Sequence, residues 1–256
     1  MSRGMRLESR IEELCDKFEF YLMKFDELNP FTGPSVYFHL RTLERLSSLG
    51  LPRALEDELF FEYLYATLTS WGMHRMGRGG AKLVEFTDFV GTLQAQKDKI
   101  LGLQGLKLTR LSEEELENVA NELWAIISHL KVSATKTQLI AASKALHHLL
   151  PDLVPPIDNQ HTLKFVYGYN PTYCSEERKF KKVYRCIWRI GVRKRDTILR
   201  WVGRGFHTSE TKVIDNAIIG YVKMRIMEKS KVRAVSYTHL RAHETEADLV
   251  CRLLLE

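Results

Sequence analysis

Apolar residues recur along most of the chain at a spacing of three and four positions, the period of an amphipathic α-helix. The clearest stripe lies between Gln138 and Leu150, where Leu139, Leu146 and Leu149 fall on one helical face. No stretch of useful length alternates between apolar and polar positions as a half-buried strand does. The pattern predicts an all-α protein, a single globular domain of about nine helices without a substantial sheet.

Turn and capping signals divide this pattern into helices. The expected ranges are 5–29, 35–49, 56–73, 84–103, 112–130, 138–150, 159–167, a strongly basic helical segment at 174–204, and 209–231. Ser112 and Glu115 have the spacing of a capping box, and Ser35 is the expected cap of the second helix. Residues 56–73 are apolar almost all round, which predicts a central position in the core. The residues expected to be buried are Phe61, Leu64, Leu68, Leu123, Ile127, Leu139, Leu146 and Leu149.

The densest set of reactive side chains lies between Ser143 and Asp158. Lys144 and His148 are four positions apart, so they share one helical face. Asp158 follows two prolines and precedes an apolar run, the position of a helix N-cap. Two interpretations of Asp158 remain open: a cap that accepts a backbone N–H, or a catalytic carboxylate at the mouth of a cleft. The candidate catalytic residues are Asp158, Lys144 and His148.

The adjacent His147 and His148 cannot point the same way, because successive helical residues are offset by about 100°. Beside a leucine-rich stripe they are expected to be satisfied residues at the boundary of the core. A zinc site would need further ligands at recognisable spacing, and the sequence has none. No metal and no cofactor are therefore expected.

Residues 136–165 resemble the catalytic region of helix-hairpin-helix DNA glycosylases. The shared pattern is a helix, a proline turn and an Asp that opens the next helix. The glycine-rich hairpin of that family is replaced here by the glycine-free sequence VSATKT at 132–137. The resemblance implies that Asp158 is the catalytic aspartate and that Lys136 or Lys144 is the lysine used by some members.

Residues 74–82 form a glycine-rich loop with three cations, Arg75, Arg78 and Lys82. Backbone N–H groups in such a loop, ahead of a helix, are able to hold an anion. The Walker spacing is absent, and no strand precedes the loop as the dinucleotide fingerprint requires. An anion site and an ordinary solvated loop both remain open.

The basic segment is the strongest signal for a partner. Residues 178–204 contain eleven Lys or Arg and one acid, Asp196, which gives a net charge of +10. A polyanion would relieve the mutual repulsion of these charges, so nucleic acid (DNA or RNA) is the expected partner. The expected nucleic-acid-binding residues are Lys181, Lys182, Arg185, Arg189, Arg193, Lys194, Arg75, Arg78 and Lys82. A solvated basic face without a partner is the alternative, and a membrane-surface helix is disfavoured because the aromatic residues are needed in the core.

Composition adds limits to this interpretation. The chain has 256 residues, 45% of them hydrophobic and 27% charged, as in ordinary soluble globular proteins. The first residues are charged and contain no apolar core of a signal peptide, and no apolar run is long enough for a transmembrane helix. The 4 cysteines are sparse and unpatterned, which is typical of reduced thiols in the cytoplasm.

The last 22 residues, 235–256, resemble a translated sequencing-library adapter of the transposase type. VSYTHLRAHET and LVCRLLLE both match the adapter in one reading frame, with Glu246 and Ala247 between them as index codons. Asp248 and Ala234 also fit the bases that this frame requires at its junctions. We expect residues 1–233 to be the native domain and 234–256 a non-native tail, which points to a metagenomic source. The tail holds two Arg and four acids, so the remainder carries +8 rather than +6.

Three functions are compatible with these patterns. The first is a nucleic-acid-associated helical protein that binds through the basic segment. The second is a glycosylase-like base-excision enzyme centred on Asp158. The third is a non-enzymatic structural or interaction domain with a solvated basic face.

Deletion of residues 235–256 is expected to change the free energy of unfolding by less than about 0.5 kcal/mol, because an adapter-derived tail was never selected to pack. Urea unfolding of the full chain and of the truncated chain measures the difference. A loss of several kcal/mol, the scale of a core element, would show that the segment is a native helix.

Overall fold

The computed structural model describes residues 3–29, 31–73, 82–168, 171 and 174–228. Its helices are α1 (Arg3–Asp16), α2 (Phe18–Glu27), α3 (Pro34–Leu49), α4 (Leu51–Ala54), α5 (Glu58–Ser70), α6 (Phe86–Gln94), α7 (Lys97–Gly102), η1 (Leu108–Arg110), α8 (Glu113–Ile127), α9 (Leu139–Leu149), α10 (Thr162–Tyr167) and α11 (Glu176–Trp201). Residues 210–228 form a further helix. The described residues contain two isolated β-bridges and no strand, so the predicted all-α class is confirmed.

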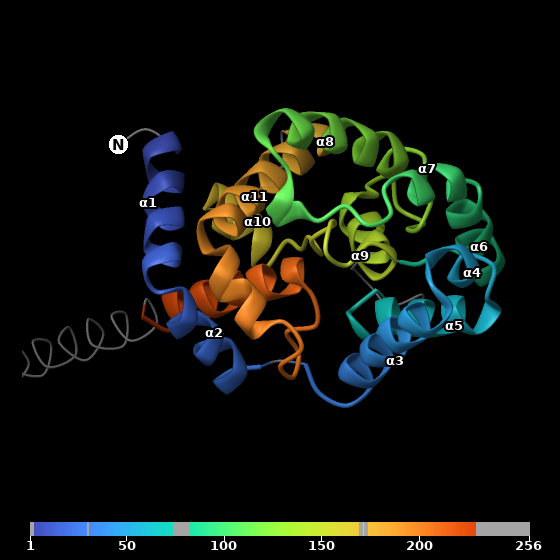
Figure 1. Cartoon of the computed structure of the whole chain (residues 1–256), viewed down its shortest axis with the longest axis horizontal. Coiled ribbons are helices and arrows are strands. Elements are labelled where there is room, and N and C mark those ends of the chain that lie inside the picture. Colours follow the sequence, from blue (N-terminus) through green and yellow to red (C-terminus); the bar gives the residue numbers. More distant parts are fainter. Residues whose placement is uncertain (1–2, 30, 74–81, 169–170, 172–173, 229–256) are drawn as a thin grey trace, which may run out of the picture.

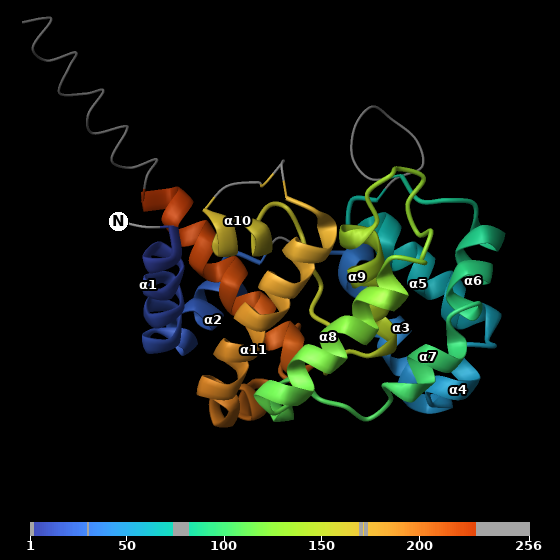
Figure 2. The ribbon, with the colours of Figure 1, turned by 90° about the horizontal axis from the view of Figure 1, so that it is seen from above.

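The helices form two groups that share one hydrophobic core (Figure 1). In the first group α3 packs against α5, and α9 packs against both. In the second group α1, α10 and α11 pack against one another, and α8 joins the groups through contacts with α9 and α11. Figure 2 shows the blue α1 beside the orange and red helix at 210–228. The two ends of the described chain therefore lie side by side.

The helix at 210–228 approaches α2 closely at Gly220. A Cβ at this position would lie 2.1 Å from the backbone oxygen of Tyr21 and 3.2 Å from the backbone nitrogen of Phe25. Backbone atoms cannot move aside as the end of a flexible side chain does. Gly220 is thus required for the contact that joins the N-terminal helices to the last helix.

Two long predicted helices are divided in the structure. The range 5–29 becomes α1 and α2, with Lys17 in a non-helical conformation between them, and 84–103 becomes α6 and α7, with a break at Gln96. The capping box of Ser112 and Glu115 is present at the start of α8. The expected Ser35 cap is wrong: α3 begins at Pro34 after Gly33, because proline is preorganised for the first helical position and has no N–H to satisfy.

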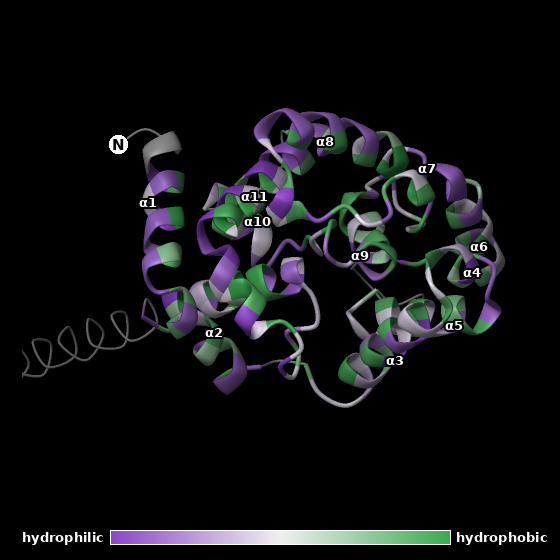
Figure 3. Cartoon of the chain, in the orientation of Figure 1, coloured by the Kyte–Doolittle hydropathy of each residue, from purple (hydrophilic) through white to green (hydrophobic). Residues whose placement is uncertain are grey.

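The expected core is confirmed. All eight residues predicted to be buried are at most 2% exposed. In α11 the inward face holds Phe180, Tyr184 and Ile187, and the hydrophilic residues lie on the other faces (Figure 3). This helix bends at Lys194, where the backbone has φ −115° and ψ 16°.

No helix in the described part of the chain is long and apolar enough to cross a membrane. The glycine-rich loop at 74–81, including Arg75 and Arg78, and the tail expected to be non-native lie outside the described residues.

Replacement of Gly220 by Ala is expected to destabilise the protein by about 1–3 kcal/mol, the usual range for overpacking, because the new methyl group would collide with backbone. Gly91→Ala is the matched control, since Gly91 is also helical and has nothing within 4 Å of its Cβ position. The control is expected to stabilise by about 0.5–1 kcal/mol through helix propensity. Equal effects of the two variants in urea unfolding would contradict the close approach.

Candidate functional site

The principal cavity has a volume of about 610 Å³ and lies between the two helix groups. Its wall combines the end of α5, the face of α9, the segment 156–161 and the helix at 210–228. Among the predicted catalytic residues, Asp158 and Lys144 line it and His148 does not. Lys136 is exposed in the neighbouring 135–137 segment and does not line the cavity, although Thr135 and Thr137 do.

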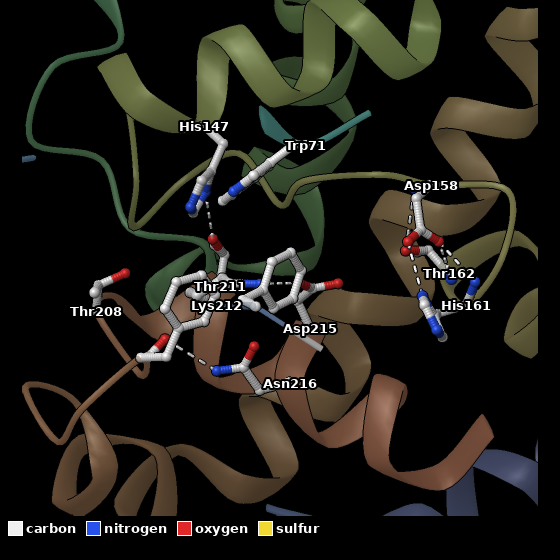
Figure 4. Close-up of polar contacts among 12 residues, drawn as sticks. Trp71, His147, Asp158, His161, Thr162, Thr208, Thr211, Lys212, Asp215 and Asn216 are labelled. Atoms are coloured by element: carbon white, nitrogen blue, oxygen red, sulfur yellow. Dashed lines mark hydrogen bonds and ion pairs between the residues drawn. The ribbon is translucent and has the colours of Figure 1, made fainter. Parts of the chain in front are cut away.

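Asp158 is held in the turn that precedes α10. Its Oδ1 accepts hydrogen bonds from the backbone N–H of His161 (2.7 Å) and of Thr162 (3.0 Å), and its Oδ2 lies 2.9 Å from His161 Nδ1 (Figure 4). Burial acts to raise the pKa of Asp158, but the bonds and charge of His161 outweigh it and hold the pKa well below its usual range. The predicted N-cap position of Asp158 is wrong, because the N-cap of α10 is His161; Asp158 lies three positions earlier, accepts the N–H groups of the turn that leads into α10, and presents an ionised carboxylate at the cavity.

The segment before Asp158 is tied to α9. Ser143 Oγ accepts a hydrogen bond from the backbone N–H of Ile157 (3.2 Å) and donates one to the carbonyl of Ile140 (3.1 Å). The side chain of Ser143 is completely buried. This bond fixes the Asp158 turn relative to the helix that carries Lys144.

Lys144 brings a cation to the cavity without an acidic partner. Its Nζ lies 3.4 Å from the carbonyl oxygen of Trp71 and 5.9 Å from the centre of the Trp71 ring. Among the described residues no carboxylate lies within 4 Å of this ammonium. Burial lowers the pKa of Lys144, while the charges of Asp158 and Asp215 oppose that effect. The neutral amine is therefore more accessible here than at the protein surface.

Lys212 and Asp215 form a buried ion pair in the cavity wall, with Nζ and Oδ2 2.5 Å apart (Figure 4). Lys212 Nζ also lies 4.9–5.4 Å from the ring centres of Phe31, Trp71 and Phe206. Burial raises the pKa of Asp215, and Lys212 opposes this increase. Sequence analysis missed this pair; the available signal was only a Lys and an Asp three positions apart within an apolar helix.

A chain of buried imidazoles lies behind Lys144. His148 Nδ1 donates to the carbonyl of Lys144 (2.8 Å), so the neutral ring accepts at Nε2, where His39 Nδ1 lies 2.9 Å away. His39 Nε2 then accepts from the hydroxyl of Thr208 at 3.0 Å. All four ring nitrogens of His39 and His148 therefore have a hydrogen-bond partner when both rings are neutral.

Burial lowers the pKa of His39 and His147 well below the usual value and lowers that of His148 to about 4. The expected boundary position of His147 and His148 is wrong, because both are completely buried. Buried partners satisfy most of their nitrogens, with His147 Nδ1 bonded to the carbonyl of Val154 at 2.9 Å. A polar residue next to a leucine stripe does not reveal from sequence whether a second helix will cover it.

Part of the basic face of α11 is paired with glutamates. Arg189 contacts Glu8 at 2.6 Å, and Arg185 lies 3.2 Å from Glu113 and 3.0 Å from Glu117. Lys181 pairs with Glu177 at 2.7 Å within the helix. Three of the six α11 cations predicted to bind nucleic acid are therefore balanced by glutamates, which reduces the mutual repulsion of the segment without removing it.

The other described residues that were predicted to bind nucleic acid have no carboxylate partner in the described ranges. Lys182 lies 4.5 Å from the centre of the Tyr167 ring. Arg193 and Lys194 have no carboxylate within 4 Å in the described part of the chain. Lys82 is exposed beside the bridge between Leu83 and Ser133.

No group of three or more His, Cys, Asp or Glu residues within the described ranges has a metal-binding arrangement. The chain matches no protein-family model, no curated protein and no solved structure.

Acidification from pH 7.5 to 5.5 is expected to lower the free energy of unfolding. The buried histidines have folded-state pKa values below the unfolded value, so the unfolded chain takes up protons first and is stabilised as the pH falls. Each such histidine contributes at most about 1.4 kcal/mol per pH unit below its unfolded pKa. Urea unfolding across this range measures the slope.

His148→Gln removes one of these titrating groups and is expected to reduce the slope. His129→Gln, at an exposed histidine, is the control and is expected to leave it unchanged. A slope that is the same in both variants would mean that His148 does not remain neutral in the folded protein.

Proposed function

We propose that this protein acts on nucleic acid and that its principal cavity receives a base for excision-type chemistry by Lys144 and Asp158. The observation that carries the proposal is the shared cavity of these two residues, in which the lysine has no acidic partner. A buried lysine with a lowered pKa is a typical Schiff-base nucleophile. The same stretch supplied the resemblance to helix-hairpin-helix DNA glycosylases.

The volume and lining of the cavity suit a planar polar group. About 300–1,000 Å³ is usual for small-molecule sites, and enzymes that act on a base take it out of the stack into a pocket. Trp71 and Phe31 offer aromatic surfaces, while Asn159 and Gln160 offer amide donors and acceptors for the edge of a base.

The proposed reaction uses Lys144 as a nucleophile. The neutral amine attacks C1′ of the deoxyribose, the bond from C1′ to the base breaks, and its electron pair leaves with the base, which then takes up a proton. Loss of a proton from the lysine nitrogen and cleavage of the C1′–O4′ bond, whose oxygen is protonated, give an iminium. The Asp158 carboxylate stabilises the positive charge that develops on the sugar.

Phosphate contacts are proposed for the cations of α11 that lack an acidic partner. The members of the predicted set in α11 that meet this condition are Lys182, Arg193 and Lys194. Arg185 and Arg189 would have to exchange Glu113, Glu117 and Glu8 for phosphate, which makes them weaker candidates.

The test is borohydride trapping of the protein on an oligonucleotide that contains an abasic site. The wild type is expected to form a covalent adduct, and Lys144→Gln is expected to reduce its yield at least about tenfold through loss of the nucleophile. Lys136→Gln is the matched control, because Lys136 is exposed close to the cavity without lining it. Gel electrophoresis after reduction measures the adduct.

Base release is measured in parallel on duplex and single-stranded oligonucleotides with a panel of damaged and deaminated bases. Asp158→Asn keeps a capping oxygen and is expected to fold, yet to slow base release by about 100-fold or more, the scale of a lost charge-stabilising group. If Lys144→Gln forms as much adduct as Lys136→Gln does, Lys144 is not the nucleophile. Absence of both an adduct and base release would exclude the function.

A further inference from the structure

A second cavity, of about 500 Å³, lies between α1, α10 and the helix at 210–228. These elements are neighbours in Figure 2 and lie on the outer side of the second helix group. The residues that line this cavity include four cations, Arg6, Arg10, Lys164 and Arg225, and one carboxylate, Glu13. The excess of positive charge is the feature that distinguishes it.

Glu13 does not compensate the group as a whole, because other residues already use both of its oxygens. Arg225 forms an ion pair with Oε2, and the hydroxyl of Tyr221 donates to the same oxygen at 3.2 Å. The hydroxyl of Tyr21 donates to Oε1 at 3.0 Å. Arg225 also pairs with Glu228 at 3.1 Å, so its charge is balanced separately.

The other three cations have no acidic partner within 4 Å among the described residues. Arg6 and Arg10 are four positions apart on α1, which places them on the same helical face. Lys164 joins them from α10. In α11, by contrast, glutamates of α8 and α1 pair with Arg185 and Arg189, and Glu177 of the same helix pairs with Lys181.

The guanidinium of Arg10 is held in place and incompletely satisfied. Its Nη2 donates to the carbonyl of Val166 at 3.1 Å, whereas its buried Nε has no hydrogen-bond partner. Burial lowers the pKa of Arg10, and the charge of Arg6 adds to that effect. Partly desolvated like charges in one place are costly, and an anion between them relieves both the repulsion and the missing interactions.

We propose that this cavity binds a phosphate group between Arg6, Arg10 and Lys164. Two arginines and a lysine suit such a group, because guanidinium forms paired hydrogen bonds to phosphate oxygens and the ammonium adds a third charge. The buried Phe165 and Val222 give the cavity apolar walls. The phosphate belongs either to a small phosphorylated molecule or to a nucleic-acid backbone.

Isothermal titration calorimetry with pyrophosphate and with a short single-stranded oligonucleotide tests the site. Arg6→Gln and Lys164→Gln are each expected to weaken binding of the occupant about tenfold, the effect of one charge-assisted contact. Lys17→Gln is the matched control, since Lys17 is an exposed cation outside the cavity and is expected to bind as the wild type does. Both target residues are at least partly exposed, so these variants are expected to fold.

Pyrophosphate binding that is lost in the two variants supports the site and identifies a small molecule as the source of the phosphate. Oligonucleotide binding that is weakened in the same variants, without measurable pyrophosphate binding, supports it with a nucleic-acid backbone as the source. No saturable binding of either probe, or equal weakening in Lys17→Gln, overturns the proposal. Because no base release is measured, failure here is distinct from failure of the chemistry proposed for Lys144.

Discussion

The contact between α2 and the helix at 210–228 is the constraint on which the rest of the structure depends. At Gly220 the two backbones approach so closely that a single methyl group would collide with the oxygen of Tyr21. This contact brings the last helix across the molecule, so that Lys212 and Asp215 complete one cavity and Tyr221 and Arg225 complete another. Both candidate sites therefore require the same helix to be docked correctly.

The charged side chains of the structure differ in whether they have a partner of opposite charge. In α11 Arg185 and Arg189 are balanced by glutamates from distant helices, and in the principal cavity Lys212 is balanced by Asp215 inside a group of aromatic rings. Lys144, Arg6, Arg10 and Lys164 have no such partner among the described residues. Uncompensated charge at a cavity, rather than positive charge as such, is what indicates a ligand, because a paired cation gains little from a second anion.

The central stretch shows how far sequence reasoning extends to the site. Proline and Asp ahead of an apolar run predicted a carboxylate that accepts backbone N–H groups at a helix start, and Asp158 accepts those of His161 and Thr162, although the N-cap itself is His161. The spacing of Lys144 and His148 predicted a shared face, yet His148 turns to the carbonyl of Lys144 and to His39, more than a hundred positions away in the chain. Helical spacing specifies a direction on one helix and leaves open which other helix meets it.

By itself the sequence determined the all-α class, the buried stripes of α5, α8 and α9, the capping box at Ser112 and the turn around Asp158, because periodicity, caps and prolines act over a few residues. Tertiary structure decided which charges are paired and which line a cavity. Glu8 reaches Arg189, and Lys212 meets Phe31 and Trp71, across long separations in the chain. Such contacts depend on how whole helices pack, and no local pattern encodes the position of a partner that arrives from another part of the fold.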